Sequence, residues 1–201
     1  MSISAFSSLK RTHLALTSAA ILALAAIGCG KPYTIIKQAN PNPFVGKTDF
    51  VVLPVDYSDL HVGDKSESEY LAGKKDSSAD SFQGDKDGMN DKFQVSLQAA
   101  TADHGLNVKA ANGVVTTFLV KPHIYFVEPG FYTAIVNAPS KTEMEVTITD
   151  QHGVELDRIK VHHGTNSGMF NPASGQRLRT DAEAMGHYVA EYLSDRTHPD
   201  K

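Results

Sequence analysis

The chain has 201 residues and a formal net charge of −4, from 19 Lys and Arg against 23 Asp and Glu. This acidic balance argues against nucleic-acid binding, because neutralising phosphates requires clustered Lys and Arg. The chain has a single cysteine, which excludes an intramolecular disulfide, so the fold has to depend on its hydrophobic core.

The chain begins with the parts of a secretory signal. Residues 1–13 contain Lys10 and Arg11 but no acid. Residues 14–27 are nearly all apolar, and a small residue follows. This apolar run is shorter than the roughly 20 residues that a membrane-spanning helix needs. We therefore expect residues 1–28 to be a signal peptide that is removed, which leaves 17 Lys and Arg against 23 acids and a net charge of −6.

The only cysteine, Cys29, stands where this signal ends. The sequence Ala26-Ile27-Gly28-Cys29 resembles the lipobox of bacterial lipoproteins, although the family usually has Leu in place of Ala26. The resemblance implies cleavage before Cys29, a diacylglyceryl thioether on its sulfur and an added N-acyl chain such as palmitate. Two or more long acyl chains make membrane attachment effectively permanent. Apart from the resemblance, Cys29 could be an ordinary buried hydrophobe, an unpaired thiol or part of an uncut anchor.

Gly30 becomes the second residue of the mature chain. In the Gram-negative lipoproteins that this chain resembles, Asp at that position favours retention in the inner membrane. The absence of Asp predicts attachment to the outer membrane, on its periplasmic face.

The mature chain predicts a tether, one domain and a tail. Proline and asparagine in residues 29–48 predict a flexible tether after the lipid-bearing residue. Residues 33–36 could form a short strand inside it. A single domain is expected over residues 49–195, with a polar tail at 196–201.

The first part of the domain predicts a strand, a loop and a helix. Residues 49–57 are β-branched and aromatic and predict a strand, which Pro54 places near an edge or a bulge. Residues 58–88 are rich in Asp, Glu, Lys, Ser and Gly and predict a long acidic loop, either functional or, preferably, disordered. Apolar residues at helical spacing then predict a helix over 89–104: Met89, Phe93, Leu97 and Ala100.

Strands dominate the remainder of the domain and are expected at 106–110, 114–120, 123–127 and 131–136. Residues 144–150 and 154–161 alternate apolar and polar residues on either side of a short turn and predict a hairpin. Thr180-Asp181-Ala182-Glu183 has the pattern of a capping box and predicts the start of the last helix. This order predicts an α+β fold, a mostly antiparallel sheet with two packed helices.

Three acids around a glycine, Asp85, Asp87 and Asp91, suggest a cation site. An EF-hand is excluded because Gln83 and Gln94 occupy the two end positions at which it requires acids. The segment is therefore either a looser cation site or a solvated turn that leads into a helix.

Nothing else in the sequence predicts a metal or catalytic site. His162 and His163 are adjacent, but neighbours on a strand point to opposite faces. The sequence has no Gly-x-Ser-x-Gly elbow, no His-Glu-x-x-His motif and no glycine-rich nucleotide motif. We expect no catalytic residue, no metal and no cofactor.

Met169 and Phe170 lie in a loop at 164–175, before the last helix. If their side chains are exposed they offer a contact to a partner, and if they fold under the domain they anchor the loop. The second arrangement is the more common one.

The strand Phe50-Val51-Val52-Leu53-Pro54, the strand at 106–110 and the final helix follow one another in an order similar to small Gram-negative envelope lipoproteins with curli-secretion-like α+β domains. The similarity implies a non-catalytic, lipid-anchored domain that binds or scaffolds another envelope component. The acidic stretch at 58–88 and the lack of a segment suited to membrane-inserting strands depart from it and argue against a pore. The alternatives are a small-ligand or cation-binding module that uses residues 58–91 and an unrecognised hydrolase.

Overall fold

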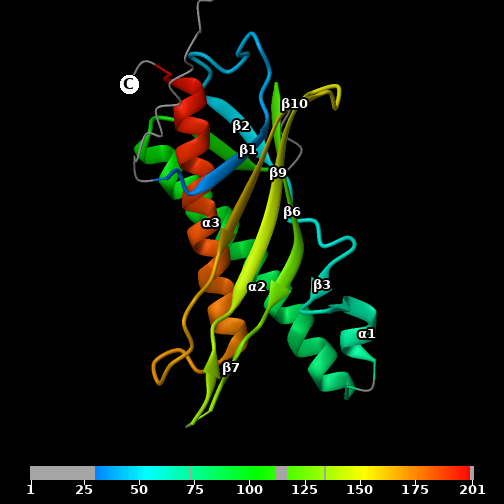
Figure 1. Cartoon of the computed structure of the whole chain (residues 1–201). Helices are drawn as coiled ribbons and strands as arrows, with labels where there is room; N and C mark the ends of the chain where they lie inside the picture. The colour runs from blue at the N-terminus through cyan, green and yellow to red at the C-terminus, as the bar shows by residue number, and fades with distance from the viewer. Residues whose placement is uncertain (1–29, 73, 112–116, 134, 200–201) are drawn as a thin grey trace, which may run out of the picture. The chain divides into compact units, whose positions relative to one another are not determined.

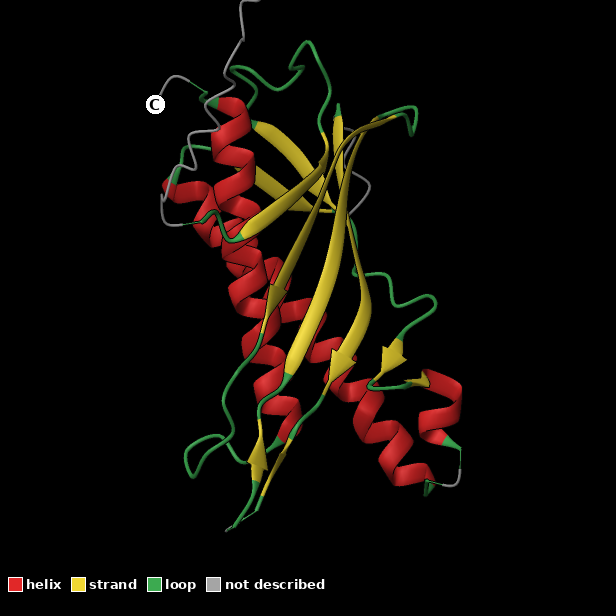
Figure 2. Ribbon diagram, viewed as in Figure 1, coloured by secondary structure: helices red, strands yellow, loops and turns green. Residues whose placement is uncertain are grey.

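Two long helices cover one face of a mixed β-sheet (Figure 1, Figure 2). The computed structural model describes residues 30–72, 74–111, 117–133 and 135–199. The helices are α1 (Glu67–Leu71), α2 (Asp76–Asp103) and α3 (Ser174–Thr197). The strands are β1 (Tyr33–Lys37), β2 (Asp49–Val52), β3 (His61–Val62), β4 (Lys65–Ser66), β5 (Asn107–Ala110), β6 (Phe118–Glu128), β7 (Phe131–Tyr132), β8 (Asn137–Ala138), β9 (Lys141–Asp150) and β10 (Glu155–His163).

The centre of the sheet is antiparallel. Six strands follow the order β1-β10-β9-β6-β2-β5, and β3 pairs with both β6 and β4. β1, β10, β9 and β6 pair antiparallel, whereas β2 runs parallel to β5 and β6. β7 and β8 form a separate small hairpin between β6 and β9. The predicted α+β class, with a mostly antiparallel sheet and two packed helices, is confirmed, and α1 adds a third, short helix.

The predicted hairpin is formed by β9 and β10. One face of β9 buries Met144, Val146 and Ile148, as the alternation predicts. In β10 the buried apolar residues are Ile159 and Val161. The pairing of these two strands shifts by one position between Glu155 and Asp157, which marks a β-bulge near the start of β10.

Pro122 does not interrupt its strand, and the strands predicted at 114–120 and 123–127 are one strand, β6, from Phe118 on. Proline has no N–H to donate, so it needs a position where no ladder bond is required. The Pro122 carbonyl accepts from the N–H of Asp56 at 2.9 Å. The Ile124 N–H, two residues further along β6, donates to the Asp56 carbonyl at 2.9 Å. Pro122 therefore lies where β2 has ended and only a single bridge continues the pairing.

The prediction of a long acidic loop at 58–88 is wrong. Most of this stretch forms β3, β4, α1 and the first turns of α2, which begins 13 residues before the predicted helix start. Phe82, seven residues before Met89, continues the apolar stripe of α2 and is 7% exposed. Its ring contacts that of Tyr70 in α1, with 5.3 Å between centroids. The polar composition reflects the solvated side of α2.

The last helix begins at Ser174 and not at the predicted capping box. Thr180 lies inside α3 and donates its hydroxyl to the Gln176 carbonyl, and Asp181 is fully buried. Arg177 and Leu178, which precede the pattern, are buried as well. The predicted polar tail at 196–201 is also corrected, because α3 continues to Thr197, whose side chain is buried.

The two long helices approach closely at Gly186 of α3. A Cβ atom at this position would lie 1.9 Å from Ser96 Oγ and 2.8 Å from the carbonyl oxygen of Phe93, both in α2. The Ser96 hydroxyl bridges the helices by donating to the Glu183 carbonyl at 2.7 Å. Only glycine at position 186 permits this contact.

We predict that Gly186→Ala lowers the free energy of unfolding by about 1–3 kcal/mol, because the methyl group would push apart two backbones. The matched control is Gly84→Ala, on the exposed side of α2, where a Cβ meets nothing within 4 Å. There alanine is expected to stabilise by up to about 1 kcal/mol through its helix propensity. Urea denaturation of both variants measures the difference. Equal effects of the two substitutions would contradict the close helix contact.

Candidate functional site

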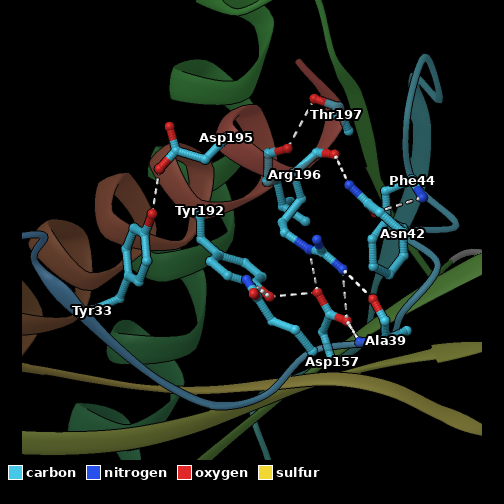
Figure 3. Close-up of polar contacts among 11 residues, drawn as sticks. Tyr33, Ala39, Asn42, Phe44, Asp157, Tyr192, Asp195, Arg196 and Thr197 are labelled. Atoms are coloured by element: carbon cyan, nitrogen blue, oxygen red, sulfur yellow. Dashed lines mark hydrogen bonds and ion pairs between the residues drawn. The ribbon is translucent and has the colours of Figure 1, made fainter. Parts of the chain in front are cut away.

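The N-terminal segment of the domain packs against α3 and the edge of the sheet. β1 pairs antiparallel with β10, and Tyr33 lies opposite Val161. The Tyr33 ring is edge-on to that of Tyr192 in α3, with 5.1 Å between centroids, and its hydroxyl donates to Asp195 (Figure 3). The expectation of a flexible tether over 29–48 is therefore wrong from residue 31 on, and the strand considered within it is present.

The carboxylate of Asp157 is the polar centre of this contact (Figure 3). Asp157 is fully buried on β10 and accepts hydrogen bonds from the Tyr192 hydroxyl and the Ala39 N–H, the latter at 2.8 Å. Arg196 donates to it through Nε at 2.7 Å and Nη2 at 3.3 Å. A buried carboxylate needs such a set of donors, because it has lost its water. We call Ala39, Asp157, Tyr192 and Arg196 the N-terminal clamp.

The clamp holds the peptide groups of residue 39 from two sides. The Ala39 N–H donates to the Asp157 carboxylate, and the Ala39 carbonyl accepts from Arg196 Nη2 at 3.1 Å. A strand edge, a helix and the N-terminal segment thus meet at one ion pair. Loss of Arg196 alone would leave the Asp157 carboxylate buried without its cation.

Residues 42–46 continue the contact and close the end of α3. Asn42 Nδ2 donates to the carbonyl of Arg196 at 2.8 Å, and the N–H of Gly46 donates to that of Thr197 at 3.0 Å. These bonds satisfy carbonyls that a helix end leaves without intrahelical partners. Phe44 is fully buried, and its ring lies 4.9 Å from that of Phe118. The N-terminal segment therefore supplies part of the core.

Burial keeps the tyrosines of this region protonated. It is the largest cause that raises the pKa of Tyr192, and the hydrogen bond to Asp157 raises it further. Burial and the bond to Asp195 raise the pKa of Tyr33 in the same way. Both phenols therefore remain hydrogen-bond donors to carboxylates at all physiological pH values.

A second feature lies at the other end of α3, where two loops expose large apolar side chains. The β7–β8 hairpin exposes Phe131 (50%), Ile135 (94%) and Val136 (56%). The loop before α3 exposes Met169 (76%) and Phe170 (94%). We call these five residues the apolar tip. The structure thus has the exposed arrangement of Met169 and Phe170 and not the tucked one.

Arg177 joins the two loops of the apolar tip. Its side chain is fully buried and donates to the carbonyls of Asn171 and Pro172, at 2.9 and 2.7 Å, in the loop before α3. It also donates to the carbonyl of Pro129, at 2.9 Å, at the start of the hairpin. One guanidinium therefore fixes both loops to the first turn of α3.

Polar contacts beneath the tip add to this connection. The Ser140 N–H donates to the Thr165 carbonyl at 2.9 Å. Asp181, buried on α3, accepts from the hydroxyls of Thr165 at 2.6 Å and Thr142 at 3.2 Å. Burial raises the pKa of Asp181, and these hydroxyl donors offset part of that rise. These polar contacts therefore connect the loop before α3 to β9 and to α3 itself.

The predicted site residues fall in different places. Cys29 lies outside the described residues. Asp85, Asp87 and Asp91 are on α2, where Asp85 pairs with Arg179 at 2.7 Å and Asp87 accepts from Gln83 Nε2 at 2.8 Å. They do not converge on one point as cation ligands would, so the reading of this segment as a cation loop is not supported.

His163 and His123 each have a separate hydrogen-bond partner. His163 Nδ1 is hydrogen-bonded to the Tyr188 hydroxyl at 2.9 Å, and His123 Nε2 contacts the Ser58 carbonyl at 2.8 Å. Among the described residues, no three His, Cys, Asp or Glu side chains lie close enough to hold a metal ion. Likewise, none of the helices in the described ranges is long and apolar enough to cross a membrane.

An open cavity of about 530 Å³ lies beside α1 and includes His61, Ser66 and Glu67 in its lining. A serine nucleophile in this cavity would need a hydroxyl that is free to attack a substrate. Ser66 instead caps α1: its hydroxyl donates to Glu69 Oε2 at 2.7 Å and accepts from the Glu69 N–H. This hydroxyl is engaged in helix capping, so the cavity gives the hydrolase alternative no support.

Two important residues, Asp157 and Arg177, are absent from the sequence-based expectations. The sequence contains one sign of the position of Asp157. The alternation of apolar and polar residues in its strand is broken between Leu156 and Ile159, as a β-bulge requires. Arg177 leaves none, because its partners are backbone carbonyls of loops whose conformation the sequence does not specify.

No protein-family model matches the chain, and no curated protein sequence matches it significantly. Among solved structures, the PelC dodecamer from Paraburkholderia phytofirmans is 7% identical, with 70% of this chain and 86% of that chain covered and a TM-score of 0.39. The dodecamer of a singly substituted PelC from the same organism is 9% identical, with 78% and 96% covered and a TM-score of 0.41. These similarities support no function for this chain, so its function has to be inferred from its own residues.

We predict that Arg196→Met lowers the free energy of unfolding by about 3–5 kcal/mol, because it leaves the buried Asp157 carboxylate without its cation. Urea denaturation at neutral pH measures this loss. Adding Asp157→Asn to Arg196→Met should recover much of the lost stability, since no buried charge then remains in the clamp.

The matched control is Lys31→Ala, which removes an ion pair with Glu191 and Asp195 at 3.1 and 3.0 Å. The Lys31 side chain is 54% exposed, so its removal should have a small effect. If Arg196→Met were no more harmful than Lys31→Ala, the clamp would not be a stabilising contact.

Proposed function

We propose that this protein is a bacterial lipoprotein, attached to the periplasmic face of the outer membrane through acyl chains on Cys29. Its folded domain is non-catalytic and binds or scaffolds another component of the envelope. The lipobox-like sequence at 26–29 and the basic and apolar stretches before it support the attachment. The absence of Asp at position 30 supports the outer membrane as its location.

The single observation that carries the proposal is that the folded domain begins a few residues after Cys29. Residue 31 is in an ion pair with α3, and β1 begins at Tyr33. Two residues of chain, at most about 7 Å, connect the Cα atoms of Cys29 and Lys31. An anchor on Cys29 would therefore hold the domain directly at the membrane. No long flexible linker would separate the two.

The apolar tip supports the second half of the proposal. Exposed apolar side chains gathered in one place are typical of contact surfaces, whereas single ones are ordinary on any protein. Five of them project from two loops that Arg177 joins. A domain fixed at one end and carrying such a surface at the other end of α3 is suited to binding rather than to catalysis.

The test is the intact mass of the protein extracted from membranes, measured beside a Cys29→Ala variant. We expect the wild-type mass to equal that of residues 29–201 plus a diacylglyceryl group and an N-acyl chain. In the variant these acyl additions should be lost. A wild-type chain without acyl groups would refute the lipoprotein assignment.

A further inference from the structure

We propose that the apolar tip inserts into a phospholipid bilayer. The occupant of this surface is then the lipid itself and not a folded protein. The inference depends on the proposed function in one respect only, that an anchor on Cys29 brings a bilayer within reach.

The two loops of the tip carry no charge. Neither residues 129–140 nor residues 164–176 include Asp, Glu, Lys or Arg, although these four make up 21% of the chain. A charged side chain is costly to place among acyl chains, so an inserting loop must exclude it.

The shape of the tip favours a fluid partner over a second copy of the chain. Ile135 and Phe170 are each 94% exposed, so they project from their turns and make almost no contact with their own domain. A protein partner would need hollows that match them, as interfaces require. A bilayer adapts to side chains of any shape.

The turns that carry these side chains satisfy much of their own backbone. The N–H of Thr133 donates to the Val136 carbonyl at 3.0 Å, and the Val136 N–H donates to Thr133 Oγ1 at 2.9 Å. In the other loop the Asn171 N–H donates to the Gly168 carbonyl at 3.2 Å, and the Asn171 carbonyl accepts a hydrogen bond from Arg177. Backbone that enters lipid needs such internal partners, because lipid offers none.

Insertion fixes the orientation of the domain. The tip adjoins the first turn of α3, whereas Lys31 pairs with residues near its end. A helix of 24 residues is about 36 Å long. The tip and an acylated Cys29 can therefore reach the same membrane only if α3 lies along its surface.

The chain contains no tryptophan, so one introduced indole reports on its own surroundings. We would reconstitute Phe170→Trp into phosphatidylcholine vesicles whose acyl chains carry bromine, which quenches tryptophan on contact. The matched control is Val154→Trp, at a position that is 57% exposed in the β9–β10 turn, far from the β7–β8 hairpin (Figure 1). We expect a blue-shifted, bromine-quenched emission from position 170 and a water-like, unquenched emission from position 154.

Ile135→Asp, added to Phe170→Trp, places a charge in the neighbouring turn without touching the core. It should lower the inserted population at least about tenfold. An emission from position 170 that bromine does not quench would overturn the inference. So would a blue shift that grows with protein concentration but ignores bromine, which would indicate a second copy as the partner. If the mass shows no acylation, the same variants added to preformed vesicles still test the tip, so the two proposals fail separately.

Discussion

The buried ion pair of Asp157 and Arg196 is the interaction on which the rest of the structure depends. Asp157 has no contact with water, so each donor that reaches it compensates part of a large desolvation cost. Those donors come from the N-terminal segment and from α3, while Asp157 itself belongs to the sheet. The segment that follows Cys29 is thereby folded together with the helix and strand that form the core.

Helix α3 connects the two features that give the domain its proposed role. Arg177 near its start bonds to the carbonyls of two loops, and Arg196 near its end bonds to Asp157 and Ala39. Both arginines stabilise irregular backbone through hydrogen bonds that a shorter side chain could not reach. The same helix packs on α2 at Gly186, so its position relative to the sheet is fixed over its length. The N-terminal clamp and the apolar tip are therefore connected through one helix.

The sequence predicts those elements whose signal is local. The alternation in β9 and β10 is a property of neighbouring residues, and it identified the hairpin and the fold class. Residues 31–44 look like a tether because their prolines and asparagines are locally irregular, while the partners that order them, such as Asp157 and Arg196, lie more than 110 residues away. Thr180 and Glu183 imitate a helix start inside a helix, because side-chain spacing alone cannot show that earlier turns are buried. Exposure of Phe170 could be weighed from its sequence but not decided, since it depends on what packs beneath the loop.

The central claim is that the chain next to Cys29 belongs to the folded domain. Hydrogen–deuterium exchange on the protein extracted from membranes and reconstituted in bilayers tests it most directly. We expect the amide of Ala39 and those β1 amides that face β10 to be strongly protected, because they are held in hydrogen bonds to Asp157 and to β10. If residues 33–44 exchanged as fast as an unstructured peptide while β9 and β10 stayed protected, the segment would be a flexible tether and the account would be wrong.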